Sequence, residues 1–511
     1  MTKNVETRAE FRSAEASVQE RSGAFKKELG LLDLALTQIL FIIGLGWIGT
    51  AAKLGPSHVV FWLFAVVLFY VPSAIVVIYL NTLMPLEGGL YQWAKLGFNE
   101  LAGFMVAWNL WIYAMVLTSE LGVQAASNLA YVLGPDFAWL AGSKWFMTVS
   151  SCVLIGALAV ISIVGLGVGK WVHNAGGFVM IAIFVALVVL PLVNARRGSI
   201  PGFQPFPVAM PAMTLLNLNI LGKLGFAALG GFEYVAIFAG ECRNPVRTIG
   251  RSVMISAPFI ALMFIVGTSS VQAFIRPDDV DLIAPIPQVL SAGTASLGMT
   301  FRVIPIVILS VLGLRVAQSS INLNATARLP LVAGWDRLLP QWFTQLSPRY
   351  RTPANSIVFV GAITLVVGLA GITGVGQQEA FQLLNNSAGI FYALTYLVMF
   401  LVPIAGLKDA EPRPPVWLRL AALSGFLMTL LYVVLSVFPI IPVGSRLSFT
   451  SKIVGLVVFA NLFGGIIFLL QHRKRENSPP QRRSRGTASF TGGTPIFLAR
   501  WRGISAEIGV I

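Results

Sequence analysis

The chain has 511 residues, of which 56% are hydrophobic and 11% charged, and its mean hydropathy is +0.79. One soluble core cannot bury so much apolar surface, whereas a bilayer accommodates it in helices of roughly 20 apolar residues. We therefore expect an all-α multi-pass membrane protein. A β-barrel is disfavoured because the apolar runs are long and do not alternate with polar residues. The net charge of +15 indicates no nucleic-acid partner, because the charges lie mostly in the connections.

About twelve apolar runs are long enough to be transmembrane helices. The polar segment 1–30 before them lacks the apolar core of a cleavable signal peptide and is predicted to be cytoplasmic. After the last run, residues 473–511 form a basic tail rich in Pro, Ser and Gly, which we expect to be disordered. The predicted spans run near 31–53, 58–84, 100–127, 145–168, 171–195, 214–240, 251–275, 300–327, 354–374, 379–406, 416–440 and 452–471.

The basic residues of the connections lie predominantly on one side of the predicted membrane. This bias and the even number of spans place both termini in the cytoplasm. We therefore expect a protein of the cytoplasmic (inner) membrane, in contact with membrane lipid, and without a soluble catalytic domain. The side with few basic residues holds Lys144, Arg196, Arg197, Arg276, Arg446 and Lys452.

Three glycines interrupt the first predicted span in the sequence GLGWIG. Gly44 and Gly46 are two residues apart and therefore point to different sides of a helix, whereas close helix packing favours small residues four apart on one face. The spacing predicts a break in the helix. A break at membrane depth is tolerated only where the freed backbone groups face a cavity or are otherwise satisfied.

The sixth predicted span has a corresponding interruption at Gly230 and Gly231, closely followed by Glu233. Broken helices at matching positions of two halves, here about 31–195 and 214–406, are the best sequence indication of a transporter's binding site. The positive end of a broken helix suits a carboxylate and freed carbonyls suit an ammonium group, so we expect an amino-acid zwitterion as substrate. The predicted binding residues at the breaks are Gly44, Leu45, Gly46, Trp47, Ile48, Gly49, Ala227, Gly230 and Gly231.

Several motifs, in the same order along the chain, resemble those of amino acid permeases of the amino acid–polyamine–organocation (APC) superfamily. The stretch GLGWI is similar to the family's G-S-G-I-F, and PLEGGLYQW is similar to P-x-x-G-G-x-Y-x-W. The stretch GFEYVAIFAGECRNPVRTIG resembles G-x-E … E-x-x-N-P-x-R-x-I-P, and the segment from ARLP to YRTP resembles the exit of the family's eighth span. The resemblance covers about residues 25–472.

This resemblance implies a five-plus-five inverted repeat (LeuT-like) with broken helices 1 and 6. The repeats would form a core over residues 31–406, followed by two additional helices over 407–472. It also implies a substrate bound between spans one, three, six, eight and ten. Transport would then proceed by alternating access, with either proton coupling or exchange against a counter-substrate.

The sequence departs from the family pattern at several positions. Leu45 replaces the serine of the glycine-rich stretch, and Ala227, with Phe226 beside it, stands where the family often has an aromatic gate. Phe226 is therefore a further binding candidate. Met180 occupies the position of a lysine found in many sodium-independent members, which leaves sodium dependence open.

The exit of the sixth span carries polar residues at family positions. The resemblance implies that Glu241, Asn244 and Arg247, together with Arg328 after the eighth span, are candidates for a cytoplasmic gate. The alternative is an ordinary helix end beside basic residues that face lipid.

Ionisable residues at membrane depth are costly and are therefore functional candidates. Glu233 adjoins the break, and the alternatives for it are proton coupling and a structural role as a permanently protonated acid. Glu120 and Arg315 are predicted to pair across the bundle. The alternative is that Arg315 binds an acidic side chain of the substrate. Lys223 is predicted to extend toward a membrane surface. Asn109 and Asn322 either line the cavity or form interhelical hydrogen bonds.

These features favour a secondary active transporter of amino acids that requires no cofactor and holds no metal. The sequence contains no phosphate-binding loop, metal cluster or catalytic triad pattern, so an enzyme is not expected. One alternative is a polyamine or organic-cation carrier of the same fold. Another is a membrane sensor or partner subunit that transports nothing. The expected partners are a small amino acid, membrane lipid, and a proton or counter-substrate.

Overall fold

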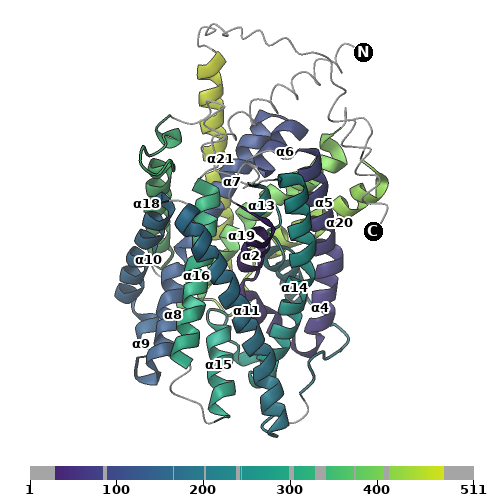
Figure 1. The fold of residues 1–511 in the computed structure, drawn as a ribbon, viewed down its shortest axis with the longest axis vertical. Coiled ribbons are helices and arrows are strands. Elements are labelled where there is room, and N and C mark those ends of the chain that lie inside the picture. The colour runs from purple at the N-terminus through teal and green to yellow at the C-terminus, as the bar shows by residue number, and fades with distance from the viewer. Residues whose placement is uncertain are drawn as a thin grey trace.

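The computed structural model is a bundle of helices, most of which run along the long axis of the molecule (Figure 1). Within the described part of the chain, the one β-type contact is an isolated bridge between Leu29 and Cys242. The structure describes residues 29–84, 89–137, 139–164, 166–200, 203–237, 242, 244–297, 304–327, 341–372, 376–407 and 414–476.

The first span is broken, as the glycine spacing predicts. Helix α2 (Leu31–Ile42) and helix α3 (Leu45–Ala52) are separated by two extended residues and bent by 43°. Gly44 is the N-cap of α3, and the Trp47 indole lies 2.6 Å from the place where a Cβ of residue 44 would lie. Only glycine leaves room for that ring, which explains the residue type at the break.

The rest of the first half consists of long helices with local irregularities. The second span contains a π-helical segment, and the third continues past Glu120 to Leu133, six residues beyond the predicted end. The elements are η1 (Gly55–Ser57), α4 (His58–Ala65), η2 (Val66–Tyr70), α5 (Val71–Leu83), α6 (Leu90–Gly97), α7 (Glu100–Ser119), α8 (Leu121–Leu133), η3 (Pro135–Phe137), α9 (Trp139–Gly142), α10 (Lys144–Val164) and α11 (Leu166–Arg196).

The second half begins with another interrupted span. Helix α12 (Leu215–Gly222) continues into the π-helical η4 (Lys223–Ala228), and the chain is then non-helical until α13 (Tyr234–Ile237). The remaining elements are α14 (Pro245–Phe274), η6 (Pro277–Asp279), α15 (Pro285–Ala295), α16 (Ile304–Ala327), η7 (Gln341–Thr344), α18 (Ala354–Ile372), α19 (Gln377–Leu401), η8 (Val402–Gly406), α20 (Val416–Leu435) and α21 (Arg446–Glu476).

The described residues contain nine helices that are long and apolar enough to cross a membrane, and the bent pair α2–α3 makes a tenth span. Two shorter apolar helices, Leu215–Ala228 and Pro305–Ser320, lie at the sixth and eighth predicted spans. The prediction of an all-α multi-pass membrane protein is therefore confirmed. One boundary differs: α21 continues to Glu476, so residues 473–476 are helical rather than part of the tail, and the tail beyond them lies outside the described residues.

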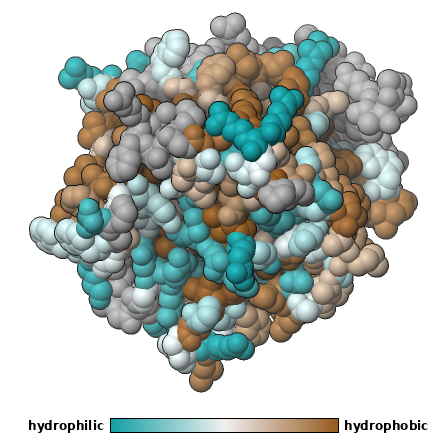
Figure 2. All heavy atoms as spheres, turned by 90° about the horizontal axis from the view of Figure 1, so that it is seen from below, coloured by the Kyte–Doolittle hydropathy of each residue, from teal (hydrophilic) through white to brown (hydrophobic). Residues whose placement is uncertain are grey.

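The outer helices expose large apolar side chains. Val153 of α10 is 63% exposed, Leu420 of α20 is 61% exposed and Phe459 of α21 is 70% exposed. Such surfaces are unfavourable in water and match the hydrocarbon of a bilayer. In contrast, Figure 2 shows hydrophilic side chains across the middle of one end of the molecule, the end where α9 and α15 lie in Figure 1.

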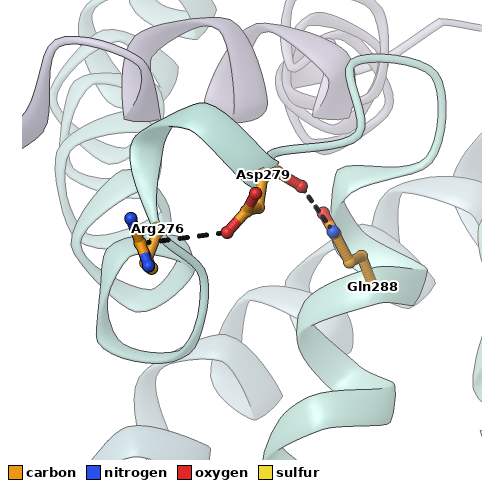
Figure 3. Close-up of polar contacts among 3 residues, drawn as sticks. All are labelled: Arg276, Asp279 and Gln288. Atoms are coloured by element: carbon orange, nitrogen blue, oxygen red, sulfur yellow. Dashed lines mark hydrogen bonds and ion pairs between the residues drawn. The ribbon is translucent and has the colours of Figure 1, made fainter.

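The connection between α14 and α15 is held by polar contacts (Figure 3). Arg276 Nε lies 3.9 Å from Asp279 Oδ2, and the Gln288 amide donates a hydrogen bond of 2.8 Å to the Asp279 carbonyl. The same Gln288 side chain accepts the Asp281 N–H at 2.9 Å. The ion pair is exposed and contributes little. The segment that carries Leu282 to the cavity is held by Gln288 and by Asp281, whose carboxylate accepts a hydrogen bond from the Tyr131 hydroxyl of α8 at 3.0 Å.

Candidate functional site

A cavity of about 120 Å³ lies where the two broken spans meet α7, α8, α16 and α19. This volume has room for one small solute or several water molecules. Its wall combines backbone at the breaks with aromatic and polar side chains. The lining residues include Phe41, Ile42, Gly44, Gly46, Trp47, Thr50, Tyr113, Glu120, Gln124, Phe226, Ala227, Gly230, Leu282, Arg315, Gln318, Asn322, Phe381, Asn385 and Tyr392.

Gln318 of α16 supports the break in the first span. Its side-chain amide donates hydrogen bonds to the carbonyls of Leu40, at 2.6 Å, and Ile43, at 2.7 Å. These carbonyls lie at the end of α2, where the helix no longer supplies N–H donors. The sequence alone does not identify Gln318, because this residue lies 275 positions or more from its partners and no local pattern connects them.

We expect Gln318→Leu to lower both thermal stability and transport. The substitution leaves two carbonyl groups at the break without their donor, at a cost of about 1–3 kcal/mol for each buried group. Thermal unfolding in detergent and uptake by reconstituted protein measure the two effects. Ser310→Ala on the same helix is the matched control, because the Ser310 hydroxyl donates only to Ile306 of its own helix. Equal behaviour of the two variants would contradict the role given to Gln318.

The break in the sixth span is built on Gly231. Its φ of +136° is unfavourable for other residues, and its N–H donates to the hydroxyl of Tyr396 at 2.7 Å. A Cβ at this position would lie 2.8 Å from Ile42 and 2.9 Å from Phe41. The two predicted breaks therefore contact each other directly, at one side of the cavity.

Glu233 is fully buried beside this break and does not line the cavity. Its two carboxylate oxygens accept hydrogen bonds from the hydroxyls of Tyr392 and Tyr396, both on α19. Tyr392 also lines the cavity, so one tyrosine separates the acid from the space where a substrate fits. The sequence does not reveal these tyrosines, because neither belongs to a motif near the break.

Aromatic rings form one side of the cavity. Tyr113 of α7 stacks on Tyr392 with 4.4 Å between ring centroids, and Phe226 lies 5.4 Å from Tyr392. Tyr234, which follows the sixth-span break, donates to Asn322 Oδ1 at 2.8 Å. Asn322 thus both lines the cavity and joins span eight to span six, which combines the two alternatives that its sequence position left open.

Glu120 and Arg315 both line the cavity but do not form the predicted ion pair. In the described residues, Arg315 Nη1 donates to Gln318 at 3.2 Å, and Glu120 Oε1 accepts from Gln124 at 2.6 Å. Arg315 Nη2 lies 3.5 Å from the place where a Cβ of Gly46 would lie. The guanidinium is therefore at the start of α3. Its hydrogen-bond partner is the neutral Gln318, and it interacts electrostatically with Glu120 without a contact within 4.0 Å.

Some predicted binding residues lie around the cavity and do not line it. Ile48 packs on Gly267 of α14, and Gly49 packs on Pro285 of α15. Because α3 is a regular helix after Gly44, only part of its circumference faces the cavity. Asn109 points elsewhere and donates to Asn461 of α21 at 2.8 Å. The other predicted residues that do not line the cavity are Leu45 and Gly231.

The candidate cytoplasmic gate is only partly described. Asn244 is the N-cap of α14 and Arg247 lies in its first turn, and both side chains are exposed. Glu241 and Arg328 lie outside the described residues. The gate therefore stays a prediction.

A family model described as amino acid permease matches residues 29–468. The chain belongs to the amino acid permease family. It is 26% identical to an uncharacterized transporter of Legionella pneumophila, over 76% of this chain and 83% of the relative. It is 23% identical to a probable agmatine/putrescine antiporter of Lactococcus lactis, over 47% of this chain and 50% of the relative.

A solved structure supports the fold of the permease. MhsT, crystallised in complex with L-phenylalanine, aligns with a TM-score of 0.59 at 15% sequence identity, covering 81% of this chain and 99% of MhsT. At this identity the likeness concerns the fold alone. Together with the family match, it establishes a multi-pass membrane transporter of the LeuT-like fold.

Lys223 of the permease does not extend to a membrane surface as predicted. It is 1% exposed, and its ammonium group donates to Asn386 Oδ1 of α19 at 2.6 Å. The ammonium also lies 5.7 Å from the ring centroid of Tyr432. The residue starts the π-helical segment η4, and its side chain points into the bundle between Asn386 of α19 and Tyr432 of α20.

We expect Asn386→Leu to destabilise the permease more than Lys223→Met. The first substitution leaves a buried ammonium without its acceptor, at a cost above the roughly 1–3 kcal/mol of a neutral buried group, whereas the second removes the charge and keeps an apolar chain of similar length. The double variant should unfold close to Lys223→Met. Thermal unfolding in detergent measures the order. A larger loss of stability for Lys223→Met than for Asn386→Leu would contradict this assignment.

Proposed function

We propose that the protein is a secondary active transporter that moves amino acids across the cytoplasmic membrane by alternating access. The observation that carries this proposal is the cavity between two broken spans, with backbone from both breaks in its wall. Broken helices that meet at a cavity are typical of transporter binding sites. The family match supports amino acids as the class of substrate.

In this proposal the substrate's carboxylate lies at the N-terminus of α3. The free N–H groups and the helix dipole at that end attract an anion even without a charged side chain. The ammonium group lies at the carbonyls of the stretch 227–230, where the sixth span stops being helical. Leu45 offers no hydroxyl that could donate a hydrogen bond to the carboxylate. The backbone N–H groups therefore contribute more to carboxylate binding than they would with a serine at this position.

Glu233 is the proposed proton-coupling residue. Protonation of its carboxyl group would weaken the hydrogen bonds from Tyr392 and Tyr396, and Tyr392 transmits this change to the cavity wall. The alternative is an exchanger, in which Glu233 only holds the break.

We further propose a transporter core over residues 31–406, with both termini of the chain in the cytoplasm. The proposed cytoplasmic gate consists of Glu241, Asn244, Arg247 and Arg328.

A polyamine carrier is the second candidate, because one relative is named for agmatine and putrescine. Such a substrate carries several positive charges and requires acidic groups around it. The described cavity wall offers the single carboxylate of Glu120, and Arg315 repels a polycation. The charges therefore favour amino acids.

Uptake by purified protein in liposomes tests the proposal. Radiolabelled amino acids and putrescine are screened with and without a pH gradient, and with and without unlabelled substrate inside. Amino-acid uptake driven by external acid indicates proton coupling, and uptake that needs internal substrate indicates exchange. Folded protein that moves putrescine alone would support the second candidate. Folded protein that moves neither would contradict transport and favour a sensor or partner subunit.

A further inference from the structure

Two side chains of opposite charge line the cavity and interact electrostatically without direct contact. Of the described lining residues, Arg315 and Glu120 alone belong to types that are charged at neutral pH. Neither forms a salt bridge within 4.0 Å. Charges at membrane depth are costly and normally have a partner. Arg315 and Glu120 interact with each other only across the cavity, so a substrate that lies between them can contact both charges.

Arg315 creates a positive end of the cavity. A guanidinium has five N–H donors and stays charged in proteins, yet the hydrogen-bond partner of Arg315 is the neutral Gln318. Its Nη2 lies beside Gly46, the second residue of α3, so the guanidinium and the N-terminus of that helix act on the same space. Two positive groups at one end of a cavity indicate a carboxylate there.

Glu120 creates the opposite end. The residue is 6% exposed, and its Oε1 is already bonded to Gln124. Its Oε2 is buried and has no hydrogen-bond partner. A buried carboxylate oxygen without a donor is unfavourable, and the side chain lines the cavity, so a donor from the substrate satisfies it. An ammonium group supplies both the donor and the compensating charge.

We propose that Arg315 and Glu120 bind the two charged ends of a substrate whose net charge is zero. Arg315 and the start of α3 receive the carboxylate, and Glu120 receives the ammonium group together with the freed carbonyls of the sixth span. This inference rests on the proposed function and adds two charged side chains to a binding site that was so far built from backbone groups. A dicarboxylate would leave surplus negative charge in the cavity and a polyamine surplus positive charge, whereas a zwitterion leaves it neutral.

Competition with truncated ligands tests each end separately. The wild type, Arg315→Gln and Glu120→Gln are reconstituted in liposomes, and uptake of the best-transported neutral amino acid is inhibited by three ligands. These are the amino acid, its analogue without the amine, and its amide; for leucine they are leucine, 4-methylpentanoate and leucinamide. Gly313→Ala is the control, because this glycine lies on α16 with open space around it.

We expect a crossed pattern. Arg315→Gln should weaken inhibition by leucine and 4-methylpentanoate by at least about tenfold and leave leucinamide unchanged, since a lost buried charge contact has an effect of this size. Glu120→Gln should weaken inhibition by leucine and leucinamide and leave inhibition by 4-methylpentanoate unchanged. If a Gln variant does not fold, Arg315→Lys or Glu120→Asp replaces it, and the same crossed pattern is expected with smaller changes.

Other patterns overturn the inference. Equal weakening of all three ligands would make the two residues structural. If Arg315→Gln lost uptake of glutamate and aspartate and kept uptake of neutral amino acids, the guanidinium would instead bind the side-chain carboxylate of an acidic substrate. Both outcomes leave amino-acid transport by the wild type intact, so they are distinct from failure of the proposed function, in which the wild type transports no amino acid.

Discussion

Gly46→Leu is expected to abolish amino-acid uptake while the protein stays folded. A Cβ at residue 46 would already lie 3.5 Å from Arg315 Nη2 and 3.6 Å from the Leu282 carbonyl. A leucine side chain would continue into the cavity that Gly46 lines and occupy the space proposed for the substrate's carboxylate. Overpacking of this kind costs about 1–3 kcal/mol even where the surroundings relax. Uptake by reconstituted protein measures the effect.

Gly156→Leu is the matched control for this substitution. Gly156 is also a helical glycine, but it lies on α10 with open space within 4 Å of its Cβ position and an exposed surface. Its replacement by leucine adds the same side chain outside the cavity and should leave uptake unchanged. Uptake by Gly46→Leu at the level of Gly156→Leu would show that the break in the first span is not part of the binding site.

Glu233→Gln is expected to remove the effect of a pH gradient on uptake while exchange of substrate continues. The amide keeps the size of the side chain and can still accept one tyrosine hydrogen bond, but unlike the carboxyl group it does not gain or lose a proton near neutral pH. Accumulation driven by external acid should therefore fall to the level without a gradient. Uptake with and without the gradient, in liposomes loaded with or without unlabelled substrate, separates the two activities.

Tyr396→Phe is the control for Glu233→Gln, since it changes the same cluster and keeps the acid. It removes one donor to Glu233 and the acceptor of the Gly231 N–H, so we expect a loss of stability of about 1–3 kcal/mol. The response to the pH gradient should remain. Full acid-driven accumulation by Glu233→Gln would mean that coupling resides elsewhere and that Glu233 only holds the broken span.

The breaks could be predicted from the sequence because glycine groups recur at matching positions of the two halves, at Gly44 and Gly46 and at Gly230 and Gly231. Adjacent glycines alone do not decide a break, since Gly176–Gly177 in α11 and Gly464–Gly465 in α21 lie within continuous helices. The long apolar runs likewise predict membrane helices without knowledge of their neighbours. The structure then adds the contact between the two breaks at Gly231, Phe41 and Ile42.

The residues that support the breaks could not be predicted, because their roles depend on distant parts of the chain. Gln318 and Tyr396 reach the breaks from α16 and α19, and neither stands in a pattern that identifies a partner. The sequence predicts that Lys223 extends to a surface, as long basic side chains often do, but the folded chain brings its ammonium group to Asn386. Glu120 and Arg315 were expected to pair, and instead each faces the cavity.

Counterflow is the most direct test of the central claim, that an amino acid binds in the cavity and is exposed to each side of the membrane in turn. Liposomes containing the protein are loaded with an unlabelled amino acid and diluted into a trace of the labelled one, with no ion gradient. We predict that the labelled amino acid transiently accumulates inside above its equilibrium level. Folded protein that gives no such accumulation with any amino acid would contradict the account.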